Sequence, residues 1–193
     1  MDEDERKPIE GLPADYVVVH LDASVPYNYR RVFGINWEEV VDYLNAKGYS
    51  VIVTGNHVKH IKGARVFKGS VRQLIRLIHH ARFFIGVDSG PSQIAASLKV
   101  PSLIFFGSVN PAFRHFQKMF RGTFLQQPCE FSGCYHEVVG GSGQPCRIVG
   151  NEGAPQCCTH TTESVLRHID LLLEKYYDRQ PAEASRATTV AST

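Results

Sequence analysis

A short polar turn has the residue types that bind phosphate groups. It reads Asp88-Ser89-Gly90-Pro91-Ser92 and directly follows an apolar run. Glycine lets a ligand approach the backbone, and proline fits the first turn of a helix. The N–H groups at such a helix start, the helix dipole and the two serine hydroxyls would favour an anion. The same string also caps ordinary helices, so the residues alone leave both interpretations open.

Two adjacent arginines offer a positive partner for such an anion. Arg30 and Arg31 follow the apolar run 16–21. A guanidinium can hold a phosphate through two parallel hydrogen bonds, which makes arginine a common diphosphate ligand. The alternative is a solvated surface pair, and the position beyond a strand end favours a binding role for at least one of the two.

All five cysteines lie within thirty residues. They are spaced Cys129-x₄-Cys134-x₁₁-Cys146-x₁₀-Cys157-Cys158. Thiolates suit zinc or iron, and four complete a tetrahedral site. The glycine-rich segment that carries them has few apolar residues to offset its ordering entropy, so a metal would stabilise it. We expect iron or zinc on Cys129, Cys134, Cys146 and one of the last pair, taken as Cys157. His136 is an alternative ligand, and unligated thiols are the alternative to any metal.

The elements that position these groups alternate between strands and helices. The runs 16–21, 50–54, 65–67, 82–87 and 101–106 are continuously apolar, as strands covered on both faces are. Helical spacing of apolar residues predicts helices over 37–46, 70–80, 92–99 and 162–177. This alternation predicts an α/β fold, a doubly wound parallel sheet, with a Cys-rich loop before the C-terminal helix. Ligands of such sheets bind beyond the carboxyl ends of the strands, where the turn and the arginines lie.

Length and composition limit the remaining choices. The 193 residues predict one Rossmann-like domain over 15–178 with a cysteine-rich finger over 126–160, a flexible lead-in over 1–14 and a disordered tail over 179–193. A net charge of +2 gives no support for a nucleic-acid partner. No apolar stretch reaches the ~20 residues of a membrane span, and the charged N-terminus lacks the apolar core of a signal peptide, so we expect a cytoplasmic protein.

One long segment resembles a known family. Residues 84–107 read FIGVDSGPSQIAASLKVPSLIFFG. This stretch is similar to the signature of glycosyltransferase family 9, the heptosyltransferases, which reads roughly D-[ST]-G-P-x-H-[IL]-A-A-A-x-x-x-P-x-x-x-x-[FY]-G. The resemblance extends over about residues 15–175. It implies the C-terminal half of a GT-B fold, the half that binds the nucleotide-sugar donor, commonly ADP-heptose.

The resemblance also implies roles for particular residues. Contact with the donor diphosphate falls to the turn Asp88, Ser89, Gly90 and Pro91. Arg30 or Arg31 would be the basic partner, and Thr54, Gly55 and Asn56 would lie near the nucleotide. Gln93 stands where the family has histidine, and an amide can form hydrogen bonds but carries no charge. The cysteine finger is similar to that of bacterial autotransporter heptosyltransferases, in which it binds iron.

The resemblance leaves catalysis open. In the family the acceptor site and the carboxylate base belong to the other half, so we expect no catalytic residue in this chain. The expected function is the donor-binding part of a heptosyltransferase-like glycosyltransferase, completed by an acceptor-domain partner chain or accompanied by self-association. In that case the apolar residues of the helix 162–177 would be partly exposed. The alternative is a non-catalytic nucleotide-sugar-binding or scaffold module.

Overall fold

A six-stranded parallel sheet organises the chain. The computed structural model describes residues 7–22, 30–56, 60–115, 120–136 and 145–178. The strands are β1 (Tyr16–His20), β2 (Ser50–Thr54), β3 (Arg65–Phe67), β4 (Phe83–Val87), β5 (Ser102–Phe105) and β6 (Gly122–Leu125), in the spatial order β3-β2-β1-β4-β5-β6. This is the order of a doubly wound dinucleotide-binding sheet, so the predicted fold class is confirmed. The order reverses between β1 and β4, which pair with each other in parallel.

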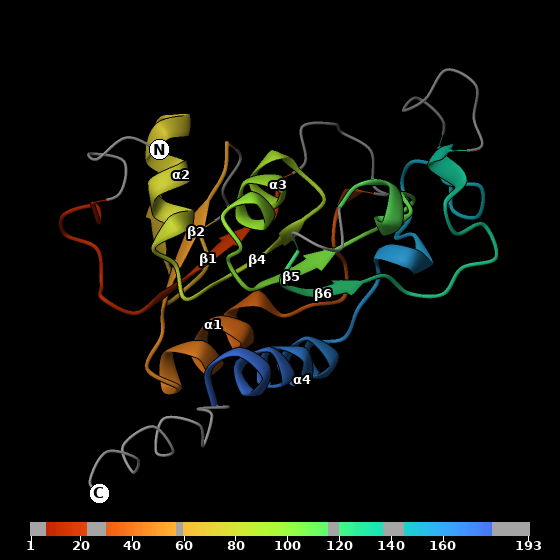
Figure 1. Ribbon diagram of the computed structural model, residues 1–193. Helices are drawn as coiled ribbons and strands as arrows, with labels where there is room; N and C mark the ends of the chain where they lie inside the picture. Colours follow the sequence, from red (N-terminus) through yellow and green to blue (C-terminus); the bar gives the residue numbers. More distant parts are fainter. Residues whose placement is uncertain (1–6, 23–29, 57–59, 116–119, 137–144, 179–193) are drawn as a thin grey trace, which may run out of the picture.

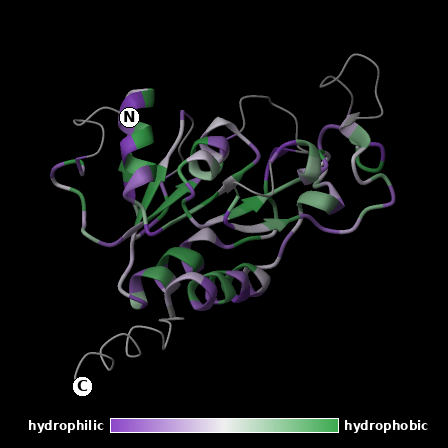
Figure 2. Ribbon diagram, viewed as in Figure 1, coloured by the Kyte–Doolittle hydropathy of each residue, from purple (hydrophilic) through white to green (hydrophobic). Residues whose placement is uncertain are grey.

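Helices cover both faces of the sheet (Figure 1). One face carries α1 (Trp37–Ala46) and α4 (Thr162–Leu173), and the other carries α2 (Val71–His79) and α3 (Gly90–Ser97). Because side chains alternate along a strand, each strand contributes to two separate cores. Val17 and Val19 pack in the core on the α1–α4 face, whereas Val18 packs in the core on the α2–α3 face. Figure 2 shows the apolar strands between helices that carry both polar and apolar residues.

The helix boundaries follow from their caps. Asn36 accepts a hydrogen bond from the Glu39 N–H at the start of α1, and Ser70 and Gln73 form a reciprocal capping box at the start of α2. The helix expected from residue 92 begins two residues earlier, at Gly90. Pro91 therefore lies inside the first turn, where its missing N–H leaves no hydrogen bond unmade.

The last helix differs from its expectation. Val165, Ile169, Leu172 and Leu173 are at most 6% exposed, because α4 packs beside α1 on the sheet. The expectation of a partly exposed apolar face is therefore wrong for these residues, although Leu171 is exposed. Regular α-helix ends at Leu173, and a π-helical turn continues over Glu174–Asp178.

Short turns shape the cysteine-rich finger. It contains the 3₁₀ turns η4 (Cys134–His136) and η5 (Gln156–Cys158), and Cys146 pairs with Gly150. Its C-terminal end joins the segment after β1, since Phe33 donates to the Cys158 carbonyl and His160 donates to the Phe33 carbonyl. Residues 137–144 lie outside the described part of the finger, and the tail expected over 179–193 lies outside the described residues altogether.

The predicted domain bounds, 15–178, stay a prediction. Before that domain, Ile9 and Leu12 of the expected lead-in pack against the core on the α2–α3 face. The Lys7 and Pro8 carbonyls accept hydrogen bonds from Arg76. No helix within the described ranges combines the length and the apolar character needed to cross a membrane.

Candidate functional site

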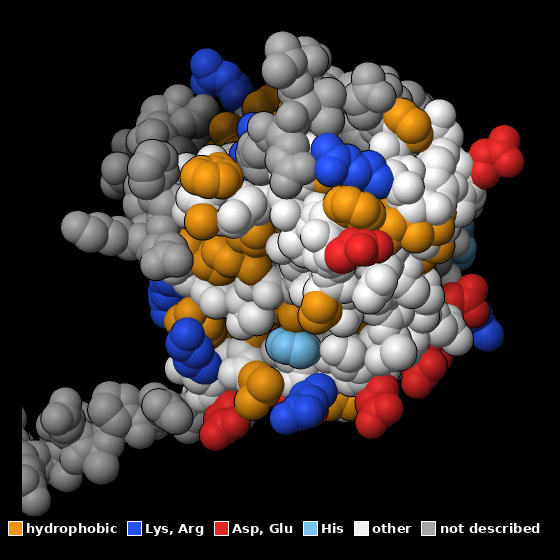
Figure 3. Space-filling model, turned by 90° about the vertical axis from the view of Figure 1, so that its right-hand side faces the viewer, with side chains coloured by type: hydrophobic (Ala, Val, Ile, Leu, Met, Phe, Trp, Pro, Cys, Tyr) orange, Lys and Arg blue, Asp and Glu red, His pale blue; other side chains and the backbone are white. Residues whose placement is uncertain are grey.

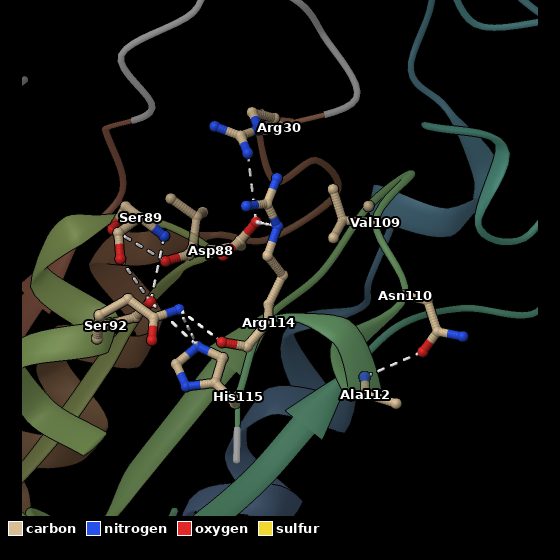
Figure 4. Close-up of polar contacts among 12 residues, drawn as sticks. Arg30, Asp88, Ser89, Ser92, Val109, Asn110, Ala112, Arg114 and His115 are labelled. Carbon is tan, nitrogen blue, oxygen red and sulfur yellow. Dashed lines mark hydrogen bonds and ion pairs between the residues drawn. The ribbon is translucent and has the colours of Figure 1, made fainter. Parts of the chain in front are cut away.

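Two arginines and one aspartate meet beyond the carboxyl ends of β1, β4 and β5. Asp88 directly follows β4, Arg30 comes from the segment after β1, and Arg114 lies just after the 3₁₀ turn η3 (Pro111–Phe113) that follows β5. The Asp88 carboxylate lies 3.4 Å from Nη2 of Arg30 and 4.0 Å from Nε of Arg114. In Figure 4, dashed lines join the Asp88 carboxylate to both guanidinium groups, which come from two different segments of the chain. Three strands thus bring opposite charges to the point where ligands of such sheets bind.

The charges of this cluster do not cancel. Two guanidinium groups share one carboxylate, so a positive charge is left over. The Arg30 side chain is only 18% exposed, and the Nε atoms of Arg30 and Arg114 are both buried without a hydrogen-bond partner. Buried donors of charged groups are costly when unsatisfied, so an anion that accepts from them would be bound favourably.

A cleft lies beside this cluster. It is a small hollow, open to solvent, lined by Arg30, Arg31, Asp88, Phe105, Gly107 and Val109. The Gln126 side-chain amide donates to the carbonyls of Gly107 and Val109, which fixes the loop after β5. Both sequence-predicted arginines therefore border the same space, with Arg30 half-buried and Arg31 exposed.

The helix start next to Asp88 is held by its own serines. The Ser92 hydroxyl accepts from the Ser89 N–H at 3.1 Å and donates to the Ser89 carbonyl at 2.8 Å. The Ser89 hydroxyl donates to the Val87 carbonyl. Their hydroxyl protons are thus directed at chain carbonyls rather than at a ligand. At Gly90, a Cβ would meet no atom within 4 Å, so backbone lies open to solvent there.

A buried histidine lies behind the helix start. Nε2 of His115 is 3.2 Å from Nε2 of Gln93, which also donates to the Arg114 carbonyl. Burial lowers the pKa of His115, and the nearby charge of Asp88 partly opposes this shift. The Gln93 amide thereby anchors the segment that carries Arg114.

The remaining predicted nucleotide-binding residues lie further along the same sheet edge. Thr54 ends β2, and its carbonyl is 3.0 Å from Nδ1 of His20. Gly55 has φ +150°, a conformation suited to glycine, and Asn56 is exposed. None of the three is among the described residues that line the cleft, so the structure does not bring them to Asp88.

The cysteines share one neighbourhood in the finger. Sγ of Cys157 is 3.8 Å from Sγ of Cys158. Burial raises the pKa of Cys134, and the nearby thiols of Cys157, Cys146 and Cys129 add to the increase. The donor set suits zinc or iron chemically. Yet no three His, Cys, Asp or Glu side chains within the described ranges converge as metal ligands would.

Another buried histidine joins the finger to the sheet. The His160 ring packs edge-on against Phe105 with centroids 5.1 Å apart, and its Nδ1 lies 3.2 Å from the Gln127 amide. Burial lowers the pKa of His160 to about 4, so the ring is neutral near neutral pH. Phe105 also lines the cleft, which places the finger next to the site.

Sequence reasoning missed Arg114 and Tyr135. The guanidinium groups of Arg30 and Arg114 lie over the Tyr135 ring. Their Cζ atoms are 5.9 Å and 5.5 Å, respectively, from the ring centroid. Arg114 could have been found, because it follows β5 at the same sheet edge as Asp88. Tyr135 carried no signal, since nothing in the sequence indicates where the finger folds back.

Comparisons with known proteins give a family match for this chain. Residues 3–119 match the family model "Glycosyltransferase family 9 (heptosyltransferase)". Lipopolysaccharide heptosyltransferase 3 of Escherichia coli is 31% identical over 122 residues, which cover 53% of this chain and 34% of that protein. The E. coli autotransporter heptosyltransferase Aah is 33% identical over 89 residues, or 40% of this chain and 23% of Aah.

The solved structures extend the likeness in fold over most of the chain. The iron-containing dodecameric glycosyltransferase TibC from enterotoxigenic E. coli superposes with a TM-score of 0.72 at 22% identity, covering 91% of this chain and 49% of TibC. The chain thus spans about a third of heptosyltransferase 3, about a quarter of Aah and about half of TibC. A parallel sheet of this order, the turn at Asp88 and a family match over more than half of the sequence lead to one conclusion: the chain belongs to glycosyltransferase family 9, the heptosyltransferases.

Proposed function

We propose that this domain binds the diphosphate of a nucleotide-sugar donor, of the ADP-heptose type, as the donor-binding part of a heptosyltransferase-like glycosyltransferase. The observation that carries the proposal is the pair of guanidinium groups that share Asp88. Each keeps a buried Nε donor that forms no hydrogen bond. The surplus positive charge lies beside the start of α3, whose first N–H groups and dipole also favour an anion.

The sugar and base are proposed by analogy. A solved structure of TibC is described as a complex with ADP-D-β-D-heptose. In the present chain the diphosphate would lie between Arg30 and Arg114, with Arg31 at the mouth of the cleft. Thr54, Gly55 and Asn56, further along the sheet edge, would face the nucleoside. Gly90 would let a phosphate reach the backbone, because no side chain of the described residues occupies that space.

A calorimetric titration tests this function. The purified chain is titrated with ADP-, UDP- and GDP-sugars, and a positive case is repeated with Asp88→Ala and with the double variant Arg30→Ala/Arg31→Ala. We expect saturable binding of one nucleotide class. The double arginine variant should weaken it because cations are lost, and Asp88→Ala should weaken it because the carboxylate that orients the Arg30 and Arg114 guanidinium groups is lost. Absence of binding at millimolar ligand would refute the donor site in this chain and favour the non-catalytic scaffold module.

The cysteine finger is proposed to hold iron or zinc as a structural metal. Support comes from the shared neighbourhood of its thiols and from TibC, which is described as iron-containing. Elemental analysis of protein purified under reducing conditions should find about one equivalent of metal per chain, as four thiolates would bind. A Cys129→Ser variant should lose it. A metal-free wild type would refute the proposal.

An assembly partner is also proposed. Transfer of a sugar to a hydroxyl needs an oriented acceptor and a base, and the family places these in the other half. We therefore propose either an acceptor-domain partner or self-association, the latter supported by TibC, described as dodecameric. Light scattering of the purified chain distinguishes the two, because only self-association raises its mass without a second protein.

A further inference from the structure

One aromatic ring in the cysteine finger contacts both arginines of the anion site. Tyr135 follows Cys134 in the turn η4, and it lies under the guanidinium groups of Arg30 and Arg114 at 5.9 and 5.5 Å. Those groups come from segments more than eighty residues apart in the chain. They converge on Asp88 as drawn in Figure 4. Tyr135 is therefore shared by the two cations that the proposed diphosphate would need.

The ring itself is fixed from two directions. Its backbone N–H donates to the Ser108 carbonyl at 3.3 Å, which ties the turn to the loop after β5. Its side chain packs on the α2–α3 core and also on the cluster of Cys157, Cys158 and Phe33. A side chain held between two packed groups loses little freedom when a ligand arrives, and its face stays where the arginines need it.

Holding two like charges together needs such a surface. The Asp88 carboxylate is 3.4 Å from one guanidinium and 4.0 Å from the other, so it compensates only one charge in full. The negative face of an aromatic ring attracts cations without forming a hydrogen bond. It can therefore orient Arg30 and Arg114 while leaving their N–H donors available to a ligand.

We infer that Tyr135 is a positioning residue of the anion site, through which the cysteine finger sets the affinity for a diphosphate. The inference rests on the proposed function, since it assumes that the arginines bind phosphate. The ligand class it names is a diphosphate, whether free or within a nucleotide. The finger is then a part of the donor site rather than a separate attachment.

Figure 3 shows the side of the molecule on which the finger lies in Figure 1. Most acidic side chains in this view lie along the right and lower rim. The helices α1 and α4 lie at the bottom of the molecule in Figure 1, which is turned about the vertical axis relative to Figure 3. The lower helices contribute acidic residues in their first turns, Glu38 and Glu39 in α1 and Glu163 in α4. An approaching anion would therefore meet less repulsion away from that rim.

The test compares a ring, its loss and a matched control. Tyr135→Phe keeps the aromatic face, whereas Tyr135→Leu keeps apolar bulk without it. Phe131→Leu is the control, because Phe131 lies in the same finger and also contacts an arginine. Cζ of Arg147 lies 5.3 Å from the centroid of the Phe131 ring, and Arg147 is not one of the two arginines that share Asp88. Each variant is titrated calorimetrically with pyrophosphate, with ADP and with adenosine, and its thermal unfolding is recorded.

The expected result is selective. Tyr135→Leu should bind pyrophosphate and ADP about three- to tenfold more weakly, the size expected for lost cation–π contacts. Tyr135→Phe and Phe131→Leu should bind as the wild type does. Affinity for adenosine should not change in any variant, because adenosine carries no phosphate.

Other outcomes overturn the inference or separate it from the proposed function. Wild-type affinity in Tyr135→Leu, or equal losses in Tyr135→Leu and Phe131→Leu, would show that the ring does not position the arginines. A wild type that binds no pyrophosphate would overturn the anion site and the inference with it. If pyrophosphate binds with the predicted dependence on Tyr135 but no nucleotide-sugar does, the donor proposal fails and the inference stands.

Discussion

The end of the sheet and the cysteine finger hold their functional side chains by different means. Asp88 extends a strand that is buried on both faces and paired on both edges, with β1 and β5 as neighbours. Tyr135 lies in a finger whose described part contains only 3₁₀ turns and two isolated bridges, an antiparallel one within the finger (Cys146–Gly150) and a parallel one to the segment after β1 (Phe33–Thr159). Ladder hydrogen bonds and apolar packing on both faces fix the strand before Asp88, whereas Tyr135 is held by one backbone hydrogen bond and by packing of its ring on the α2–α3 core and on Cys157 and Cys158.

The difference shows how one binding site can depend on two kinds of stability. Sheet residues open only with global unfolding, whereas loops with few buried apolar contacts open locally at lower cost. The arginines meet residues from both regions, Asp88 on one side and Tyr135 on the other. Ligand affinity should therefore respond to changes in the finger that leave global stability intact.

The largest effect should come from the sheet core. Phe84 in β4 is fully buried, so Phe84→Ala should lower the free energy of unfolding by about 3–5 kcal/mol. The same truncation in the finger, Phe131→Ala, should cost less than about 1 kcal/mol, because Phe131 is partly exposed. Urea unfolding measures both. Equal losses would show that the finger unfolds together with the sheet, and would contradict the lower local stability expected for the finger.

Next in size is the loss of a guanidinium. Arg30→Ala and Arg114→Ala should each weaken nucleoside diphosphate binding by about 10- to 100-fold, the range for a charged hydrogen bond. Arg31→Ala is the matched control, since Arg31 borders the cleft but is exposed, and it should cost only a few-fold. Calorimetric titration gives the three values. An Arg31 effect equal to that of Arg114 would place the anion at the mouth of the cleft instead.

A smaller effect should appear as a pH dependence of stability. Burial lowers the pKa of His115 in the folded protein below its ordinary value of 6.5. The unfolded chain then takes up a proton that the folded chain does not, so stability is lost as the pH falls through and below about 6.5. Asp88 opposes the shift without reversing it.

The His115→Gln variant isolates this contribution. His20 and His160 also have pKa values lowered by burial and add a pH dependence of the same sign in both proteins. Unfolding free energies of wild type and His115→Gln are therefore compared at pH 7 and pH 5. The variant should lose less stability than the wild type between the two values. If wild type and variant lose the same stability between pH 7 and pH 5, His115 is protonated to the same extent in the folded and the unfolded chain.

The smallest expected change concerns a single methyl group. Gly90→Ala should leave the fold intact, because Gly90 begins α3 and its added Cβ meets nothing within 4 Å. Binding of a nucleoside diphosphate should weaken a few-fold if phosphate approaches the backbone there. Calorimetry with a parallel thermal unfolding curve checks both. Unchanged affinity would move the phosphate away from the helix start.

Periodicity made the sheet predictable and the finger unpredictable. The apolar runs at 16–21 and 82–87 predicted strands buried on both faces, and the rule for strand ends then indicated Asp88 and the pair Arg30 and Arg31. Burial of α4 was missed because the sequence does not say which surface an amphipathic helix covers. Tyr135 was missed because the finger has no regular period, and its contact with Arg114 depends on a fold-back that no spacing encodes.

The most direct test of the account is a crystal structure of the chain with bound ADP. In the proposed site the diphosphate lies between Arg30 and Arg114, beside the start of α3. We expect both guanidinium groups, which share Asp88 in the free protein, to donate to phosphate oxygens, with the Tyr135 ring still beneath them. Nucleotide bound elsewhere, with neither arginine contacting a phosphate, would contradict the claim.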